Sequence, residues 1–311
     1  MKIIDTHCDA LWKIQLSNRS LDYQSSDELH TNIERLKKGN VYVQFYAIFI
    51  EPEVLVEDKW RDALDQIEIF EREVIAKNSE MVHITKWEQL NELKQGQIGA
   101  VLTLEGADAF GNDLEKLNEL YRRGVLSIGL TWNNANLCAD GVEEPRGAGL
   151  TALGKQVVQS NNERGVLTDV AHASEKTFWD VIDVAKYPFA SHSNARAICD
   201  HPRNLYDDQI KAVLNKGGLM QVVFHPPFIK ENSDTATISD LIKHIDHICS
   251  LGGVKQIGFG SDFDGIERVV TKLEHSGQYT YLIDELLKYY SEEEIRGFAH
   301  QNFINFCERI V

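Results

Sequence analysis

The feature that most constrains the fold is a series of short, continuously apolar runs spread along the chain of 311 residues. A strand that is apolar on both faces is buried on both sides, and its alternation with helices indicates parallel β/α units. Eight such units predict an α/β fold, the (β/α)8 or TIM barrel. The predicted strands are residues 2–5, 41–50, 99–104, 125–131, 166–171, 188–191, 218–224 and 255–260.

Stretches with the apolar spacing of amphipathic helices separate most of these strands. An open, doubly wound sheet is the alternative arrangement, but it usually carries a glycine-rich turn after its first strand. The stretch THCDALW, which follows the first predicted strand, contains no such turn. The predicted helices are residues 56–77, 113–123, 151–163, 175–184, 206–215 and 238–250, with 280–290 and 292–309 as extra C-terminal helices.

Composition sets the class of protein. No linker rich in Pro, Gly or Ser divides the chain, so we expect residues 1–311 to form a single barrel domain. The net charge of −16 argues against a nucleic-acid or anionic-membrane partner. Without a signal-like segment or a run of membrane-spanning length, we expect a cytoplasmic protein with no membrane contact. The 5 cysteines include no CxxC pair and indicate neither a disulfide framework nor a cysteine zinc site.

The first predicted strand ends on the motif THCD, in which His7 and Asp9 are two residues apart. In extended backbone such residues point to the same side. An imidazole nitrogen and a carboxylate oxygen placed together are typical ligands of a divalent transition metal. Taken alone, the pair is better explained by hydrogen bonds within a turn, because so short a pattern often occurs by chance.

Other chemistry-bearing residues also follow predicted strands, where the active sites of such barrels lie. Each of these residues alone has an ordinary explanation. Glu105 could be a carboxylate at the start of a helix, and His172 could be a core histidine. Asp262 and Asp264 could form a turn before Gly265. Their joint position at one rim favours a site. The residues expected there are His7, Asp9, Glu105, His172, His192, Asp262 and Asp264.

This set exceeds what one tetrahedral metal needs, so we expect two metal ions that share a carboxylate, with Glu105 as the bridge. A hydroxide held between two such ions is a strong nucleophile at neutral pH. The site therefore predicts hydrolysis.

Five stretches of the chain resemble the membrane (renal-type) dipeptidases, peptidase family M19. The matching stretches are IDTHCD, LTLEGAD, GLTALGKQVVQSNNERGVLTDVAHAS, ASHSNARAICDHPRNL and IGFGSDFDGI, in order along essentially the whole chain. The resemblance implies a (β/α)8 barrel with two Zn²⁺ ions that hydrolyses dipeptides, often with a D residue at the C-terminal position. Family members of animals are membrane-anchored, whereas this chain resembles a bacterial cytoplasmic relative, and a homodimer is an expectation at the level of the family.

The resemblance also assigns roles to individual residues. One zinc would be held by His7 and Asp9 and the other by His172 and His192, with Glu105 as the bridge. Asp262 would lie beside the first metal and act as proton acceptor and donor. Arg203, in HPRNL, would bind the free carboxylate of the substrate, although without the resemblance a surface salt bridge is the preferred explanation.

The sequence departs from the family pattern at Trp132, which stands where many members have a substrate-binding histidine. Trp132, Asn133 or Asn134 would then donate to the substrate oxyanion, or Trp132 would only line the wall of the site. The departure keeps an alternative open: a deacylase or lactonase of the amidohydrolase type. A catalytically idle barrel is disfavoured, because the complete set of metal-facing residues is present.

Overall fold

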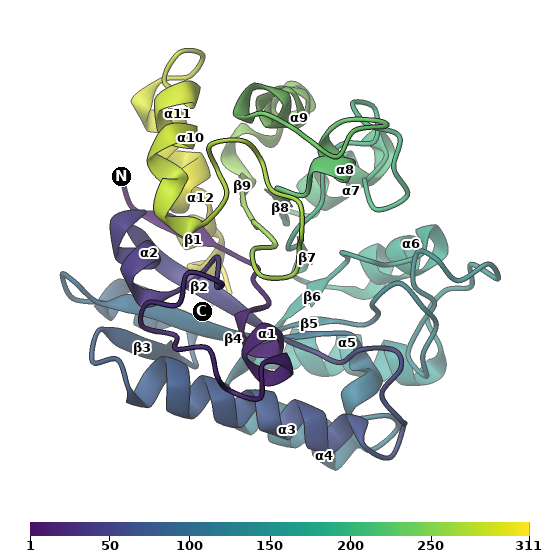
Figure 1. Cartoon of the computed structure of the whole chain (residues 1–311). Coiled ribbons are helices and arrows are strands. Elements are labelled where there is room, and N and C mark those ends of the chain that lie inside the picture. The colour runs from purple at the N-terminus through teal and green to yellow at the C-terminus, as the bar shows by residue number, and fades with distance from the viewer. Residues whose placement is uncertain (311) are drawn as a thin grey trace.

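The computed structural model describes residues 1–310 and shows a closed parallel barrel surrounded by helices (Figure 1). Neighbouring strands follow the order β2-β1-β9-β8-β7-β6-β5-β4, and pairing of β2 with β4 closes the ring. All eight predicted strands are present, which confirms the (β/α)8 barrel. They are β1 (Ile3–Asp5), β2 (Val41–Phe49), β4 (Ile98–Glu105), β5 (Val125–Gly129), β6 (Leu167–Asp169), β7 (Pro188–Ala190), β8 (Leu219–Val222) and β9 (Ile257–Phe259).

A further strand, β3 (Met81–Ile84), was not predicted. It pairs with the first half of β4, along the edge that β5 occupies in the second half. β3 therefore lies beside the ring rather than within it. Its two central residues are half-buried, so its short sequence MVHI lacks the continuous apolar character of the barrel strands.

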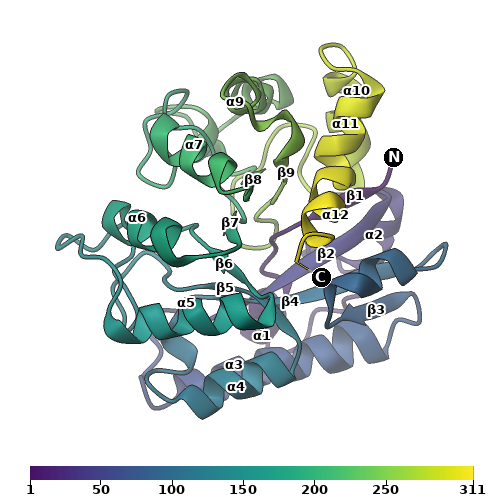
Figure 2. The same ribbon diagram turned by 180° about the vertical axis from the view of Figure 1, so that it is seen from behind.

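The predicted helices cover the outside of the barrel (Figure 2). Several begin where the sequence supplies a capping side chain: Thr151, Ser174 and Thr237 each accept a hydrogen bond from the backbone N–H three residues ahead. Two predicted helices contain a π-helical segment. The helices are α3 (Lys59–Ile69) with η1 (Phe70–Ala76), α4 (Leu114–Arg122), α5 (Ala152–Arg164), α6 (Glu175–Val184), α7 (Asp207–Asn215), α9 (Ile238–Ser250), α10 (Tyr279–Leu286), and α11 (Glu292–Arg296), η6 (Gly297–Gln301) and α12 (Asn302–Cys307).

Short helices in the loops escaped prediction because they span only one or two turns. They are α1 (Ala10–Leu16), α2 (Ile33–Lys38), α8 (Pro226–Ile229), and the 3-10 turns η2 (Trp87–Glu92), η3 (Ala107–Ala109), η4 (Gly253–Lys255) and η5 (Ser276–Gln278). Within residues 1–310, the helices are all too short or too polar to cross a membrane.

The C-terminal helix α12 closes one end of the barrel. Phe303 packs against Phe45 of β2 and Phe189 of β7, with ring centroids 5.3 and 6.2 Å apart. Phe45 and Phe189 belong to an apolar cluster inside the barrel. A separate cluster lies between the strands and the outer helices. The opposite, carboxyl-terminal mouth of the barrel is left for the loops that carry the predicted site.

Candidate functional site

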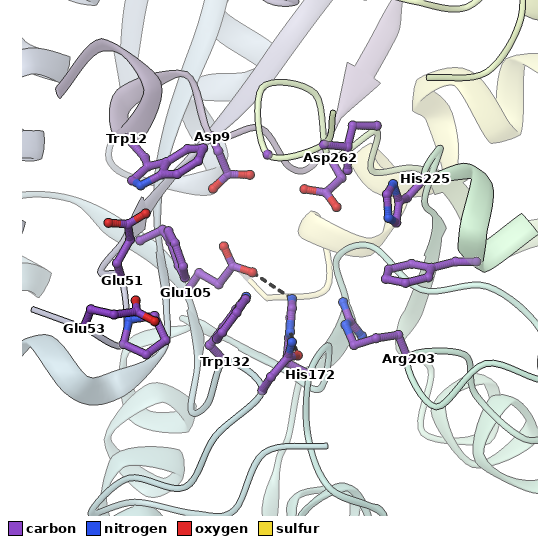
Figure 3. Close-up of a pocket in the computed structure, with 16 residues that line it drawn as sticks. Asp9, Trp12, Glu51, Glu53, Glu105, Trp132, His172, Arg203, His225 and Asp262 are labelled. Atoms are coloured by element: carbon purple, nitrogen blue, oxygen red, sulfur yellow. Dashed lines mark hydrogen bonds and ion pairs between the residues drawn. The ribbon is translucent and has the colours of Figure 1, made fainter. Parts of the chain in front are cut away.

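Six side chains predicted from separate parts of the sequence meet at the carboxyl-terminal mouth of the barrel. Figure 3 shows four of them: Asp9, Glu105, His172 and Asp262. His7 and Asp9 follow β1, and Glu105 is the last residue of β4. Loops after three later strands complete the group, which comprises His7, Asp9, Glu105, His172, His192 and Asp262. Their assembly follows from the fold, since the carboxyl ends of all barrel strands open at one face.

Glu105 lies at the centre of this group and presents its two oxygens to different sides. Oε2 is 3.4 Å from Nε2 of His7, whereas Oε1 is 2.8 Å from Nε2 of His172 and 3.8 Å from Nε2 of His192. The side chain of Glu105 is only 10% exposed, and those of the histidines are 8% or less. One carboxylate thus joins two sets of ligand atoms in a nearly dry environment.

A second set surrounds His7. Its Nε2 lies 3.3 Å from Oδ2 of Asp9 and 3.8 Å from Oδ1 of Asp262. The potential ligand atoms of these three residues all lie within 4.8 Å of one another, as do those of His7, Glu105 and His192. The geometry therefore contains two overlapping groups of N and O atoms of the kind that bind zinc.

The hydrogen bonds of two histidines show that these atoms fit a cation. Nδ1 of His172 lies 2.6 Å from Oδ1 of Asn133, and Nδ1 of His192 lies 2.7 Å from Oγ of Ser191. When the imidazole Nδ1–H donates to such oxygens, Nε2 carries a lone pair. The two Nε2 atoms are nevertheless only 2.9 Å apart. In these tautomers two lone pairs face each other beside a carboxylate, an arrangement that a bound cation would stabilise.

Unpartnered atoms lead to the same conclusion. Nε2 of His7 and Oδ1 of Asp9 are buried and have no hydrogen-bond partner among residues 1–310. A buried polar atom without a partner costs about 1–3 kcal/mol. Coordination of metal ions would satisfy both atoms.

Burial and charge set the protonation of the group. Burial lowers the pKa of His172 to about 4, and the charge of Arg203 acts in the same direction, so the imidazole is neutral. Burial alone would raise the pKa of Glu105, but His7 and His172 hold it well below its usual value. Burial raises the pKa of Asp262 well above its usual value, and the nearby carboxylates of Asp9 and Glu105 add to this effect.

Glycine 265 allows the carboxylates to approach one another. A Cβ atom at Gly265 would lie 2.2 Å from Oδ2 of Asp9 and 2.6 Å from Oδ1 of Asp262. Asp262 itself has a left-handed backbone, with φ of 66°, and His172 has φ of 64°. Such backbone is uncommon for residues other than glycine and is concentrated at functional sites.

Buried aspartates hold the loops in place. Asp5 accepts hydrogen bonds from the N–H and the hydroxyl of Ser261, at 2.9 and 2.7 Å, which ties β1 to the loop that carries Asp262. Asp169 accepts from the N–H groups of Ala171 and Ser191, at 2.9 and 3.0 Å, next to His172 and His192. The site is thus supported by the ends of β1 and β6.

Asp264 does not belong to the cluster, although the sequence placed it at the same rim. Its carboxylate accepts hydrogen bonds from the backbone N–H groups of His30 and Thr31, at 2.6 and 2.9 Å, and contacts Lys13 at 3.3 Å. The side chain therefore anchors a loop instead of facing the histidines. Its left-handed backbone, with φ of 70°, turns it away from the direction that simple alternation predicts.

His244 supports the loop after His192 and provides a test of stability against pH. Its Nδ1 accepts from the N–H of Ala195 at 3.2 Å and its Nε2 donates to the carbonyl of Ile229 at 2.9 Å. Burial lowers the pKa of His244 to about 4. Below pH 6.5 the unfolded chain binds a proton there that the folded chain does not, so this group makes the free energy of unfolding fall with decreasing pH.

We expect His244→Gln to reduce the loss of stability between pH 7 and pH 5 by about 2 kcal/mol. The measurement is urea unfolding of metal-free wild type and variant in the presence of a chelator, so that metal release does not contribute. Above pH 7 the slopes of the two stability profiles should agree. Equal losses in both proteins between pH 7 and pH 5 would show that His244 does not titrate in this way.

The cluster opens into a cavity of about 320 Å³. Arg203 lines it, is 5% exposed, and has an Nε atom without a partner among residues 1–310. Its guanidinium lies 5.5 Å from the ring centroid of Phe228, and no ion pair holds it in the described part of the chain. The explanation of Arg203 as a surface salt bridge is therefore wrong. Trp132 lies in the wall between Phe49 and His172, with ring centroids 5.4 and 6.0 Å away.

Several lining residues were not identified from the sequence. Most lie in loops or in short helices within them, whose course the sequence does not reveal, and Phe49 is the last residue of β2. Only Gly265, within the motif SDFDG, carried a recognisable signal. The missed residues are Trp12, Phe49, Glu51, Pro52, Glu53, His225, Phe228, Gly265 and Ile266.

A closed parallel barrel with histidines and carboxylates gathered at its carboxyl-terminal mouth defines a metal-dependent hydrolase. Residues 1–310 match the family model described as membrane dipeptidase (peptidase family M19), and the chain belongs to this family. The protein is therefore a metal-dependent enzyme that hydrolyses dipeptides.

Individual relatives and solved structures are similar to this chain over nearly its whole length. An uncharacterized dipeptidase of Schizosaccharomyces pombe is 33% identical over 333 residues, which cover 99% of this chain and 80% of that protein. A metallopeptidase of Rhodobacter sphaeroides, solved with a phosphinate mimic of the dipeptide L-Ala-D-Ala, has the same fold, with a TM-score of 0.93 and 23% identity over 100% of this chain and 99% of that one. A probable dipeptidase of Pseudomonas aeruginosa gives a TM-score of 0.89 at 21% identity, over 99% of this chain and 95% of that one.

Proposed function

We propose that the protein is a dipeptidase with two zinc ions that cleaves both L-Xaa-L-Xaa and L-Xaa-D-Xaa substrates. The observation that carries this proposal is the position of Glu105, whose Oε2 faces the buried imidazole of His7 and whose Oε1 faces those of His172 and His192. His7, Asp9 and Glu105 would hold one ion, and Glu105, His172 and His192 the other. Bound there, the ions would supply a water of lowered pKa and polarise the scissile carbonyl.

The stereochemical part of the proposal rests on the structural neighbour from Rhodobacter sphaeroides, which was solved with a mimic of L-Ala-D-Ala. The cavity of this chain holds its aromatic side chains and its single arginine around the cluster, and both types of dipeptide carry the carboxylate that this arginine would bind.

Asp262 is assigned the proton transfers. Its carboxyl group lines the cavity within 3.8 Å of Nε2 of His7, and Arg203 is among the charges that act on it. We propose that Asp262 accepts a proton from the attacking water and donates it to the leaving amine. A carboxylate that is buried and close to the cluster suits both steps, because burial raises its pKa above the usual value and so favours uptake of a proton.

Arg203 is assigned to the C-terminal carboxylate of the substrate. We expect Arg203→Lys to raise KM by about tenfold or more with a smaller change in kcat, since an ammonium replaces two parallel hydrogen bonds by one point charge. Steady-state kinetics with a dipeptide and its C-terminal amide measure the effect. Wild type should strongly prefer the free carboxylate and the variant should not. An unchanged KM for the dipeptide would remove Arg203 from the substrate site.

Trp132 is proposed to contact the substrate as part of the cavity wall. Asn133 is engaged with His172 and therefore positions this imidazole, which leaves Asn134 and the indole N–H of Trp132 as the remaining donors suggested by the sequence. A deacylase or lactonase stays the second candidate, because Trp132 replaces the family histidine. The same substrate panel tests both candidates.

The first experiment is elemental analysis of the purified protein together with two assays of turnover. Release of amino acids is measured with dipeptides and N-acetyl amino acids, and ring opening to the hydroxy acid is measured with lactones. About two zinc ions per chain and turnover of dipeptides would support the proposal. Two zinc ions with turnover only of the acyl or lactone substrates would favour the second candidate. Failure to bind metal under several loading conditions would contradict the site.

We also propose that residues 1–311 act as one domain in the reducing cytoplasm of a bacterium. Its cysteines are all free thiols in the described part of the chain, as is usual in that compartment. A homodimer stays a prediction, which the mass of the protein in solution tests.

A further inference from the structure

The two ends of the cavity differ in chemistry. Arg203 and His225 lie on one side of the cluster, whereas Glu51 and Glu53 lie on the other, next to Trp12 (Figure 3). All five side chains line the same cavity. The unpartnered Nε of the buried Arg203 shows that one end is built to receive an anionic group.

The acidic end is not neutralised by the protein. In residues 1–310, the ion pairs include neither Glu51 nor Glu53. Arg19 and Arg61 line a second hollow of about 580 Å³ that shares Glu51. Both arginines are already paired, Arg19 with Asp65 and Glu68, and Arg61 with Asp58. The carboxylate of Glu51 is therefore free to pair with a cation from the substrate.

An aromatic wall leads from the cluster to this acidic end. Trp132 packs against Phe49, and Phe49 against Trp12, with ring centroids 5.4 and 6.0 Å apart. Trp12 and Phe49 also line the second hollow, so the same aromatic side chains border both spaces. A long side chain with an apolar stem and a charged end fits such a path, because its stem packs on the rings and cations are attracted to aromatic faces.

In the proposed orientation of the substrate, only the side chain of its N-terminal residue can follow this path. With the C-terminal carboxylate at Arg203 and the scissile carbonyl at the cluster, the N-terminal residue points toward Glu51 and Glu53. Its ammonium group is only two bonds from the carbonyl carbon and therefore stays near Asp9 and Asp262. Only its side chain can reach the acidic end.

We propose that Glu51 and Glu53 are specificity residues that select dipeptides with lysine or arginine at the N-terminal position. The proposal rests on the function proposed above. It deepens that function by naming the substrate class.

The test compares kcat/KM for Lys-Ala with norleucyl-Ala and for Arg-Ala with citrullyl-Ala, which are pairs of similar length that differ in charge. Wild type should favour the cationic member by about tenfold or more, as expected for a hydrogen bond between charged groups. The double variant Glu51→Gln/Glu53→Gln should lower this ratio at least about fivefold, and high salt should lower it in wild type. Glu57→Gln is the matched control, because Glu57 is an exposed carboxylate of the same loop that lines neither hollow. Its ratio should equal that of wild type.

Three results would contradict the specificity proposal or the dipeptidase function on which it rests. Equal rates for cationic and neutral substrates in wild type would overturn the specificity proposal and leave the dipeptidase intact. A double variant that slows all four substrates by the same factor would show that the glutamates bind the ammonium group instead. Hydrolysis of none of the four, together with none of the dipeptides in the broader panel, would contradict the proposed function itself.

Discussion

Replacement of Asp262 by asparagine is expected to lower kcat by about 10²–10⁴ while the protein keeps its fold and its metal. Asparagine has nearly the same shape and tolerates the left-handed backbone of this position, where φ is 66°. It cannot accept and return a proton. Since Asp262 lies 3.8 Å from Nε2 of His7 and lines the cavity, the loss should fall on the chemical step rather than on substrate binding.

The measurement combines kcat and KM for one dipeptide with elemental analysis of the variant. Asp264→Asn is a matched control, because it lies in the same loop with φ of 70° but binds His30 and Thr31. The Asp264→Asn variant should have a lower unfolding temperature than wild type. Its kcat, calculated per folded and metal-loaded chain, should equal that of wild type. Near-wild-type kcat in an Asp262→Asn protein that holds two ions would end the assignment of Asp262 as the proton carrier.

The second large effect is expected from Glu105→Gln. The side chain is 10% exposed and its two oxygens face His7 on one side and His172 on the other, so a neutral amide would weaken both metal positions together. We expect fewer than two zinc ions per chain and a fall in kcat/KM of about 10³ or more.

Thermal unfolding gives a readout that does not depend on catalysis. Added zinc should raise the unfolding temperature of metal-free wild type, because a ligand that binds only the folded state stabilises it. Added zinc should raise the unfolding temperature of metal-free Glu105→Gln much less. Glu115→Gln, an exposed carboxylate at the start of α4, should respond like wild type. Two tightly bound ions in Glu105→Gln would contradict the bridging position.

The sequence predicted the ring of strands because buried parallel strands leave a direct apolar signature. Phe45 in β2 and Phe189 in β7 are fully buried, and continuously apolar runs like theirs are typical of parallel strands covered on both faces. β3 was missed because it pairs only with the first half of β4 and is half-exposed. The helix α1 was missed because its seven residues form only about two turns.

The meeting of His7, Glu105 and His192 was predictable for a topological reason. Once the strands are parallel and closed, the residues that follow them share one face. The acidic end of the cavity was not predictable, because Glu51 and Glu53 lie in a loop whose sequence resembles any solvated acidic segment. Asp264 was expected at the rim but contacts a neighbouring loop instead. The local turn determines which way its carboxylate points, and the order of the strands does not predict that turn.

The joining of β1 to β9 has a consequence for biosynthesis. Ser261 donates to Asp5 from 256 residues away, and the N–H of Asp262 donates to the carbonyl of His7 at 3.2 Å. A ribosome releases the chain from its amino-terminal end, so His7 and Asp9 emerge long before the strand that completes their surroundings. The complete cluster therefore forms only after nearly the whole chain has been made. Acquisition of the two proposed metal ions would then be an event of the finished polypeptide and would depend on the metal available to it after release.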